Sequence, residues 1–169
     1  MATKKSMLVL FGILVISAWV LGSALQVGAE TMNYKFYTWV NKAENIPIDD
    51  VDEHLVWMHQ RGSMYVFENG EVATVNAIVQ GDMVNWKGPF MQYVTIKFPD
   101  NSMIIIKSQG KAGGGTAADW KSEIIKGTGR FEGIKGTQSA KGKYLPVEKG
   151  EGGQRGYGEG VITYTLPSK

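Results

Sequence analysis

The sequence predicts an all-β fold, an antiparallel eight-stranded barrel, preceded by an N-terminal signal peptide. Alternating runs rich in β-branched and aromatic residues, bounded by Gly, Pro, Asn or Asp, recur along the chain after residue 30. Helical periodicity is hard to find in the same region, so no alternation of strands and helices is predicted. The chain also has 22 glycines, several inside strand patterns, where they allow the bends and bulges that close a barrel.

Residues 1–29 have the pattern of a cleavable signal peptide. Lys4 and Lys5 form a positive start, an almost unbroken apolar run extends from Met7 to Leu25, and small residues follow as far as Ala29. We therefore predict cleavage after Ala29, a single barrel domain over residues 30–169, and a periplasmic or secreted location. The alternative is a retained anchor, because the apolar run approaches the roughly 20 residues that span a bilayer. No second run of this length occurs, so no membrane span is predicted after cleavage.

The predicted mature chain is electrically balanced. Lys4 and Lys5 account for the formal net charge of +2, and no acidic residue precedes Glu30. Nucleic-acid binding needs a surface that neutralises phosphates, so we predict no nucleic-acid partner. The chain has no cysteine, which excludes thiol catalysis and thiolate metal sites and leaves core burial to hold the domain together.

The first half of the domain contains three clear strands and one open segment. Tyr34 to Val40 alternates well enough to be the first strand. Ser63 to Phe67 and Val72 to Val79 flank Asn69-Gly70, the strongest short hairpin signal, in which both central turn residues take positive φ. The segment from Asn45 to His59 stays open between a loop with a short helical turn and a second strand.

The second half continues the same rhythm of strands and turns. Asp82 to Trp86 is interpreted as a continuation or bulged extension of the preceding strand, ended by Gly88-Pro89. Met91 to Phe98 and Met103 to Lys107 form a second hairpin around the turn residues Pro99 to Ser102. The remaining predicted elements are a flexible loop (Lys111 to Gly115), a strand (Trp120 to Ile125), a glycine-rich stretch (Gly127 to Gly142), a long loop (Val147 to Gly156) and a last strand (Tyr157 to Leu166).

The most specific motif is the run from Gly127 to Thr137. A glycine-rich loop can cradle a phosphate, but neither a Walker A pattern nor a following helix is present, so nucleotide binding is not predicted. We assign the motif a structural role. Gly127 and Gly129 allow a tight strand exit, Phe131 plugs one end of the barrel, and Gly133 and Gly136 permit a bent return.

This motif and the later run from Gly158 to Tyr164 resemble the signature of the allene oxide cyclase and dirigent barrel superfamily. In that superfamily a Gly-x-Gly-x-Phe turn links two late strands of an eight-stranded antiparallel barrel. The resemblance implies an apolar cavity that is open at one end, and a homo-oligomer, either a dimer or a trimer. None of the family's catalytic or binding residues matches a position of this sequence, so the resemblance implies the fold and no particular activity.

The only cluster of acids and imidazoles lies between Asp49 and His59. A metal site would need two converging imidazoles, but the spacing of His54 and His59 fits neither one face of a helix nor one face of a strand. We therefore predict no metal site and interpret the segment as a solvated acidic loop. Either histidine titrates near neutral pH, yet the sequence shows no partner for acid or base catalysis.

Aromatic residues on the predicted strands are the candidates for a ligand cavity. They usually fill a core, yet the interior of a barrel of about eight strands can also hold one small ligand. Trp and Tyr side chains in a cavity suit a hydrophobic or aromatic molecule. No nucleophile elbow occurs, so no catalytic residue is named and no cofactor is predicted. The cavity candidates are Trp39, Trp57, Tyr65, Trp86, Tyr93 and Trp120.

Three functions remain open at this point. The sequence favours a protein that binds a small apolar molecule inside the barrel, rather than an enzyme. The second function is an isomerase or cyclase acting on an apolar substrate, which requires an ionisable side chain, such as a carboxylate, pointing into the cavity. The third is a structural or interaction protein of the cell envelope with a filled barrel. A cavity smaller than roughly 300 Å³ would favour this third function.

Overall fold

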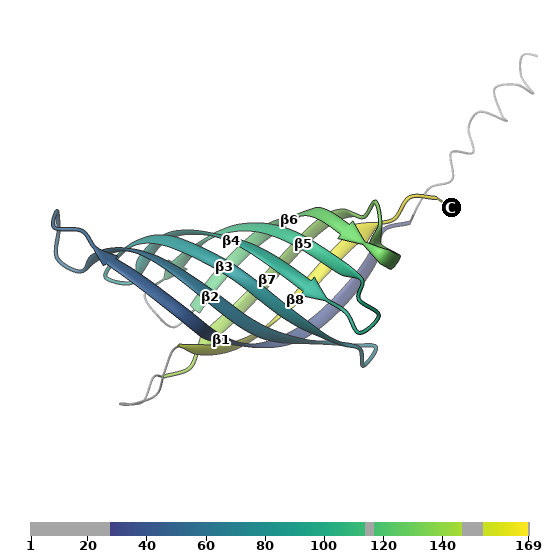
Figure 1. Ribbon diagram of the computed structural model, residues 1–169, viewed down its shortest axis with the longest axis horizontal. Coiled ribbons are helices and arrows are strands. Elements are labelled where there is room, and N and C mark those ends of the chain that lie inside the picture. Colours follow the sequence, from purple (N-terminus) through teal and green to yellow (C-terminus); the bar gives the residue numbers. More distant parts are fainter. Residues whose placement is uncertain (1–27, 114–116, 147–153, 169) are drawn as a thin grey trace, which may run out of the picture. The chain divides into compact units, whose positions relative to one another are not determined.

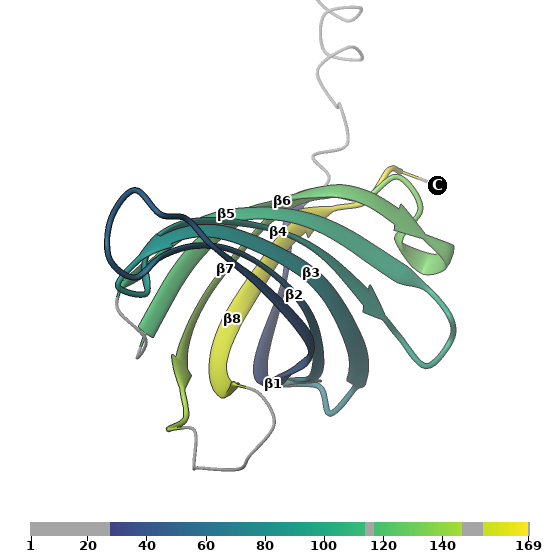
Figure 2. The same cartoon turned by 60° about the vertical axis from the view of Figure 1, so that its left-hand side comes forward.

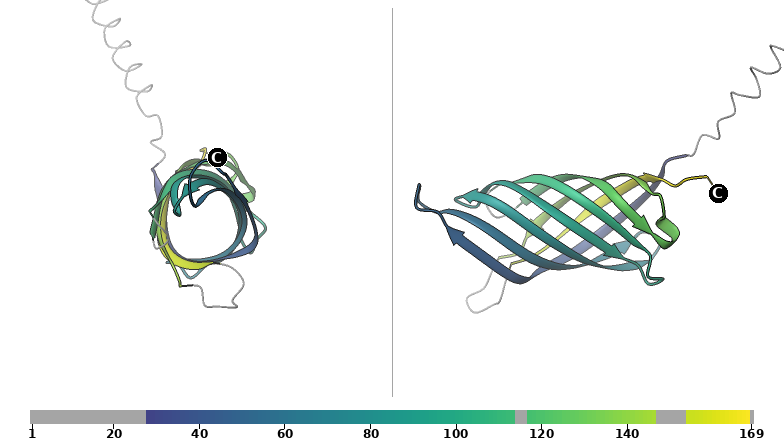
Figure 3. Two further views of the ribbon diagram at one scale, coloured as in Figure 1. Left: turned by 90° about the vertical axis from the view of Figure 1, so that its left-hand side faces the viewer. Right: turned by 45° about the horizontal axis from the view of Figure 1, so that its top comes forward.

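The described residues form one closed antiparallel β-barrel. The computed structural model describes residues 28–113, 117–146 and 154–168. Each strand pairs with the next in sequence order, and β8 pairs back with β1 to close the barrel (Figure 1). The left view of Figure 3 looks along the barrel and shows this closed ring. The predicted all-β, eight-stranded antiparallel barrel is therefore confirmed.

The strands are longer than the alternating runs that predict them. The segment from Asn45 to His59, which the sequence left open, belongs to two strands and the turn between them. β1 continues to Pro47, and β2 begins at His54. The predicted loop from Lys111 to Gly115 is strand as far as Gly113. The strands are β1 (Glu30–Pro47), β2 (His54–Phe67), β3 (Val72–Val84), β4 (Lys87–Lys97), β5 (Met103–Gly113), β6 (Ala117–Thr128), β7 (Lys135–Tyr144) and β8 (Arg155–Thr165).

Two predicted segments lie mainly outside the described residues. Of the predicted leader, 1–29, the structure describes only Gly28 and Ala29. Residues 147–153 of the predicted long loop are likewise outside it, and the last two residues of that loop, Arg155 and Gly156, belong to β8.

The hairpin turns differ from expectation in one respect. Between β2 and β3 only Gly70 has positive φ, 84°. Asn69 instead accepts a hydrogen bond from the Glu71 backbone N–H through its side chain, at 3.0 Å. The turn with two positive φ angles occurs between β3 and β4, at Asn85 (52°) and Trp86 (61°). The chain therefore reverses at Trp86, and Gly88-Pro89 lies within β4 rather than ending a strand.

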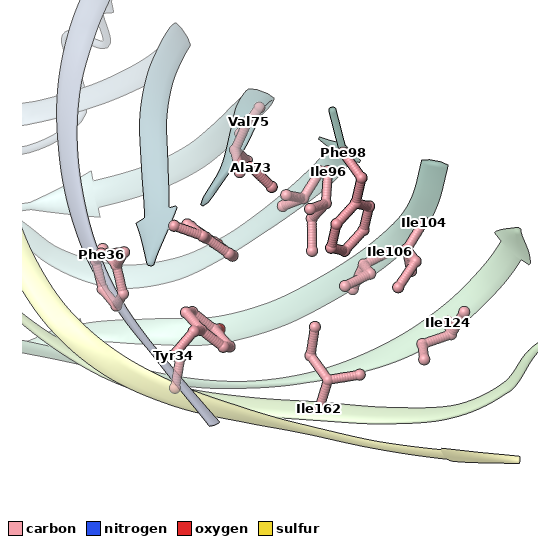
Figure 4. Packing of buried hydrophobic residues seen from close by; sticks show 14 of the residues in the cluster. Tyr34, Phe36, Ala73, Val75, Ile96, Phe98, Ile104, Ile106, Ile124 and Ile162 are labelled. Carbon is pink, nitrogen blue, oxygen red and sulfur yellow. The ribbon is translucent and has the colours of Figure 1, made fainter. Parts of the chain in front are cut away.

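One end of the barrel is plugged by aromatic packing around η1 (Gly129–Phe131). Phe131 is 3% exposed, and its ring centroid lies 4.8 Å from that of Phe98 and 6.2 Å from that of Tyr164. Figure 4 shows the neighbouring core, in which Phe98 and Ile162 and the isoleucines of β4, β5 and β6 converge from different strands. We call this the plugged end.

The motif glycines bring the chain close to itself at this end. A Cβ at Gly127 would lie 2.0 Å from the Phe131 carbonyl oxygen, and a Cβ at Gly136 would lie 2.1 Å from the Thr163 carbonyl oxygen. Gly129 and Gly133 have positive φ, 62° and 75°. The tight approach and the left-handed backbone together require small residues in the chain reversal from β6 to β7.

One cross-strand row around the inside of the barrel has aromatic residues separated by one or two small residues. Trp57 on β2 pairs with Gly81 on β3, and Gly81 pairs with Phe90 on β4. A Cβ at Gly81 would lie 2.8 Å from the Trp57 ring, so the ring occupies the space that a side chain would need. The whole cross-strand row is Trp57, Gly81, Phe90, Gly110, Trp120, Ala140, Gly160 and Tyr34.

Replacing Gly136 by alanine is expected to destabilise the barrel. The added methyl group would meet backbone atoms of Thr163 and Tyr164, which cannot rotate away. We expect a loss of about 2 kcal/mol or more in the free energy of unfolding, measured by urea denaturation. Ser139→Ala, an exposed position on the same strand, serves as the control and should change stability by less than about 0.5 kcal/mol. Equal stability of both variants would contradict the structural role of Gly136.

Candidate functional site

A cavity of about 60 Å³ lies inside the barrel, toward the end opposite η1. Its position follows from the size of the inward residues along the strands. Along β8, Ile162 and Tyr164 face inward near the plugged end, whereas Gly156, Gly158 and Gly160 face inward near the opposite end. The cavity wall includes the exposed residues Lys143 and Tyr157, so the cavity reaches solvent. We call this the cavity end; Figure 2 shows the same barrel from another side.

The cavity wall combines aromatic and polar side chains. Seven aromatic residues line it, and the polar side chains come from β1, β2, β4 and β7. The aromatic side chains are Phe36, Trp57, Tyr65, Phe90, Trp120, Tyr144 and Tyr157, and the polar ones are Thr38, Arg61, Ser63, Gln92 and Lys143. No Asp or Glu of the described residues lines this cavity.

The structure brings three of the six predicted cavity residues together. Trp57, Tyr65 and Trp120 line the cavity. Trp39 lies on the outer face, where its ring covers Gly62, and Tyr93 is also outside and 44% exposed. Trp86 occupies the turn between β3 and β4 and is 51% exposed. The outward positions follow from strand alternation, because the inward neighbours of Trp39 and Tyr93 fix the phase of β1 and β4.

Arg61 is the functional candidate that sequence reasoning missed. It lies on β2, where Trp57, His59, Arg61, Ser63 and Tyr65 all point inward. This period of two was present in the sequence, but it becomes visible only when the segment before Ser63 is assigned to the same strand. The ambiguity between loop and strand in that segment therefore concealed the one cationic side chain among the described inward residues that line the cavity.

Arg61 is a buried cation with neutral partners. Its side chain is inside the barrel and only 7% exposed. Nη1 donates a hydrogen bond to Gln154 Oε1 at 3.2 Å, and Nε donates to Thr38 Oγ1 at 3.5 Å. Cζ lies 5.4 Å from the centroid of the Tyr144 ring. Nη2 is buried and has no hydrogen-bond partner among the described residues. Burial lowers the pKa of Arg61 from its ordinary value, yet a guanidinium stays charged.

Two further donors of the cavity wall are also without partners. The indole Nε1 atoms of Trp57 and Trp120 are buried and form no hydrogen bond with any described residue. An indole N–H can only donate, as can a guanidinium. The wall of this cavity therefore offers unsatisfied donors and has an excess of positive charge.

A row of polar side chains lies deeper in the barrel. Cross-strand pairing connects Gln92 to Ser108, Ser108 to Ser122 and Ser122 to Gln138. Ser122 Oγ donates to Ser108 Oγ at 2.7 Å, and Gln138 Nε2 donates to the hydroxyl of Tyr34. Burial raises the pKa of Tyr34 well above its ordinary value, so this phenol is protonated at neutral pH. These contacts join uncharged polar groups. Among the described side chains that point into the cavity, Arg61 therefore supplies the charge.

The two histidines lie in different environments and do not converge. His54, at the start of β2, bridges two carboxylates, with Nδ1 2.5 Å from Asp50 Oδ1 and Nε2 2.7 Å from Asp82 Oδ1. These hydrogen bonds, chiefly the one with Asp50, raise the pKa of His54 above its ordinary value. His59 lies inside the barrel, with its ring centroid 4.3 Å from that of Trp57. Within the described ranges, no group of acids and histidines is arranged to hold a metal ion.

Comparisons with known proteins identify the fold. No protein-family model matches the chain, and no curated protein matches it. Among solved structures, the pterocarpan synthase dirigent protein GePTS1 is similar with a TM-score of 0.50 and 13% identity, over 86% of this chain and 95% of that one. A DUF3224-family protein of unknown function from Shewanella oneidensis MR-1 is similar with a TM-score of 0.53 and 14% identity, over 83% of this chain and 100% of that one.

The chain therefore has the dirigent-like and allene oxide cyclase-like barrel fold, as the glycine motif predicted. At these identities the likeness concerns the fold. In the part of the chain that the structure describes, no helix has the length and apolar character needed to span a membrane.

His59 makes the stability of the barrel sensitive to acid. Burial, and to a lesser extent the charge of Arg61, lowers its pKa to about 4, below the ordinary value of 6.5. As the pH falls, His59 is therefore protonated in the unfolded chain before it is protonated in the folded chain. The stability that depends on neutral His59 is complete above pH 6.5 and is lost as the pH falls toward 4. We expect a loss on the order of 2 kcal/mol between pH 7 and pH 4.5 from His59 alone.

The variant His59→Gln isolates this contribution. Urea denaturation at pH 7 and pH 4.5 should show a smaller loss of stability in the variant than in the parent protein, because glutamine does not titrate. A His54→Gln variant is the matched control. Because the pKa of His54 is raised, its contribution to the free energy of unfolding is present below pH 6.5 and is lost as the pH rises. The same acid sensitivity in the parent protein and in His59→Gln would contradict the assignment.

Proposed function

We propose that this is an exported barrel protein that binds a small molecule in the cavity at one end of its interior. The observation that carries the proposal is the asymmetry of the interior. The plugged end is filled by Phe98, Phe131 and their neighbours, whereas the cavity end keeps a solvent-reaching space with aromatic walls and a few polar groups. Ligand sites typically combine an apolar lining with a small number of orienting polar groups.

The side chains of the cavity wall narrow the chemical class of the apolar ligand that the sequence predicts. Aromatic rings favour an apolar body, while Arg61, Thr38 and Gln92 favour a polar group at one position of the ligand. A volume of about 60 Å³ is far below the roughly 300 Å³ of pockets for drug-sized ligands. The proposed ligand therefore has few non-hydrogen atoms inside the barrel.

A second candidate function is supported by the same volume and by the outer surface. By the volume criterion derived from the sequence, a cavity of about 60 Å³ favours a filled barrel that acts through its exterior. Apolar side chains are exposed on the outer faces of β2, β3 and β4, which favours association with another copy or with an envelope partner. These side chains are Val56, Met58, Met64, Val66, Val72, Ile78 and Tyr93.

The enzyme alternative has weaker support. One of the similar solved structures, GePTS1, is a pterocarpan synthase, so a barrel of this fold occurs in a protein that is named as an enzyme. A cyclase that relies on a carboxylate needs an Asp or Glu in the cavity wall, and the described lining offers Arg61 instead. The proposed binding function needs only the aromatic and polar side chains that line the cavity.

Export is proposed from the leader pattern of residues 1–29. Expression of the full sequence in a host with a signal peptidase should yield a protein whose intact mass corresponds to a chain starting at Glu30, found outside the cytoplasm. Replacing Ala29 by a bulky residue, as in Ala29→Phe, should block this cleavage because the peptidase subsite accepts small residues. An intact mass that includes residues 1–29 would instead indicate a retained anchor.

Ligand binding is tested by native mass spectrometry of the protein purified gently from its native host. We expect a stoichiometric small-molecule adduct that is released by denaturing extraction. Ala77→Leu fills the cavity from an inward position of β3 and should abolish the adduct, whereas Ile78→Leu, at the exposed neighbouring position, should retain it. An adduct retained by Ala77→Leu would place the ligand elsewhere. A repeatedly empty protein with raised stability in Ala77→Leu would favour the filled barrel.

A further inference from the structure

The described part of the chain contains one deeply buried guanidinium without an acidic partner. Arg130, at the plugged end, forms an ion pair with Glu71 at 2.6 Å and lies 3.6 Å from Asp100. Arg61 is more deeply buried, yet no Asp or Glu within the described ranges forms an ion pair with it. The contrast between the two arginines indicates that Arg61 does not serve an internal salt bridge.

Burial of this charge is unfavourable for the barrel alone. A charged group that leaves water loses solvation, and proteins usually offset this loss with an opposite charge and a full set of hydrogen bonds. Arg61 has two neutral acceptors, from Thr38 and Gln154, and an aromatic ring, while its Nη2 donor is unsatisfied. An anion that enters the cavity would supply both the missing charge and the missing acceptor.

The groups around Arg61 limit the charge and shape of such an anion. Neutral His59 adds no second positive charge to the interior, and Lys143 occupies an exposed position of the wall. The donors of Trp57 and Trp120 need acceptors rather than cations. A single guanidinium matches a monoanion, and its planar edge matches the two oxygens of a carboxylate. The aromatic wall formed by Phe36 and Phe90 suits a short alkyl or aryl group.

We propose that Arg61 binds the carboxylate of a small monocarboxylic acid, whose apolar part lies against the aromatic wall of the cavity. This inference rests on the proposed small-molecule function and gives its ligand a chemical class. Arg61 becomes the residue that determines specificity, because a neutral ligand of the same shape leaves the buried charge without a partner.

The test compares acids with their neutral amides on the protein in the form that its host produces. Acetate, propionate and benzoate are titrated at pH 7, each beside acetamide, propionamide or benzamide. The readout is the NMR signal of each indole N–H, assigned with single Trp→Phe variants. Trp57 and Trp120 line the cavity, whereas Trp39 and Trp86 lie outside it and serve as internal controls.

We expect each carboxylate to shift the Trp57 and Trp120 signals and to bind at least tenfold more tightly than its amide. Arg61→Met should reduce carboxylate affinity at least tenfold and leave amide affinity unchanged. The same variant should raise the Tm of the ligand-free protein by about 4 °C or more, because an unpaired buried charge is removed. Arg130→Met, which removes the same charge at the plugged end, should keep the preference for acids.

Other outcomes would overturn the inference. Equal affinity for acids and amides in the parent protein would exclude recognition of charge, and this comparison needs no variant. Unchanged acid affinity in Arg61→Met, or shifts confined to Trp39 and Trp86, would place the anion elsewhere. If no acid or amide shifts any signal while native mass spectrometry still finds an adduct, the carboxylate proposal alone fails. If no adduct is found either, the small-molecule function fails with it.

Discussion

The structure depends on a packing constraint inside the barrel: large rings on the strands, such as Tyr34, Phe36 and Trp57, have a glycine as their cross-strand partner on at least one side. The interior of an eight-stranded barrel is just wide enough for its side chains. In the row that begins at Trp57, the residues Trp57, Phe90 and Trp120 are each followed on the next strand by glycine or alanine, and Tyr34 is preceded by Gly160. At Gly160, a Cβ would lie 2.3 Å from the Tyr34 hydroxyl oxygen. The glycines are thus places where a ring from a neighbouring strand is accommodated.

The same constraint explains why the two ends differ. Toward the plugged end, inward positions hold Ile104, Ile106 and Ile162, and the rings of Phe98 and Phe131 complete the packing. Toward the cavity end, the inward residues of β5 and β8 become small, and the space that remains is bordered by rings and by Arg61. The gradient in side-chain size along the strands therefore produces both a stable core and a candidate site. The stable core and the candidate site therefore lie at opposite ends of one barrel.

The strand pattern of the sequence predicted the fold and part of the candidate site. Alternation located most strands, and the glycine motif predicted the barrel type because its tight approaches are local in the chain. Three of the six aromatic candidates, Trp57, Tyr65 and Trp120, line the cavity. The inward phase of a strand depends on its pairing, which is not local, and Trp39 and Tyr93 consequently proved to lie outside.

Arg61 could not be recognised for a related reason. Its significance comes from burial without an acidic partner, which is a property of the closed barrel rather than of the neighbouring sequence. The turn at Asn85 and Trp86 was equally hidden, because tryptophan is an unusual residue at positive φ and no local rule favours it there. Local patterns predicted the elements, and the contacts between strands decided which side chains meet.

A double-mutant cycle at Gly160 and Tyr34 tests the packing constraint most directly. The free energy of unfolding is measured by urea denaturation for the parent protein, Gly160→Ala, Tyr34→Leu and the double variant. If the ring occupies the space above the glycine, Gly160→Ala should cost about 1–3 kcal/mol in the parent protein and less than about 0.5 kcal/mol when Tyr34 is already leucine. An equal cost in both backgrounds would mean that the ring does not set the requirement for glycine and would contradict the account.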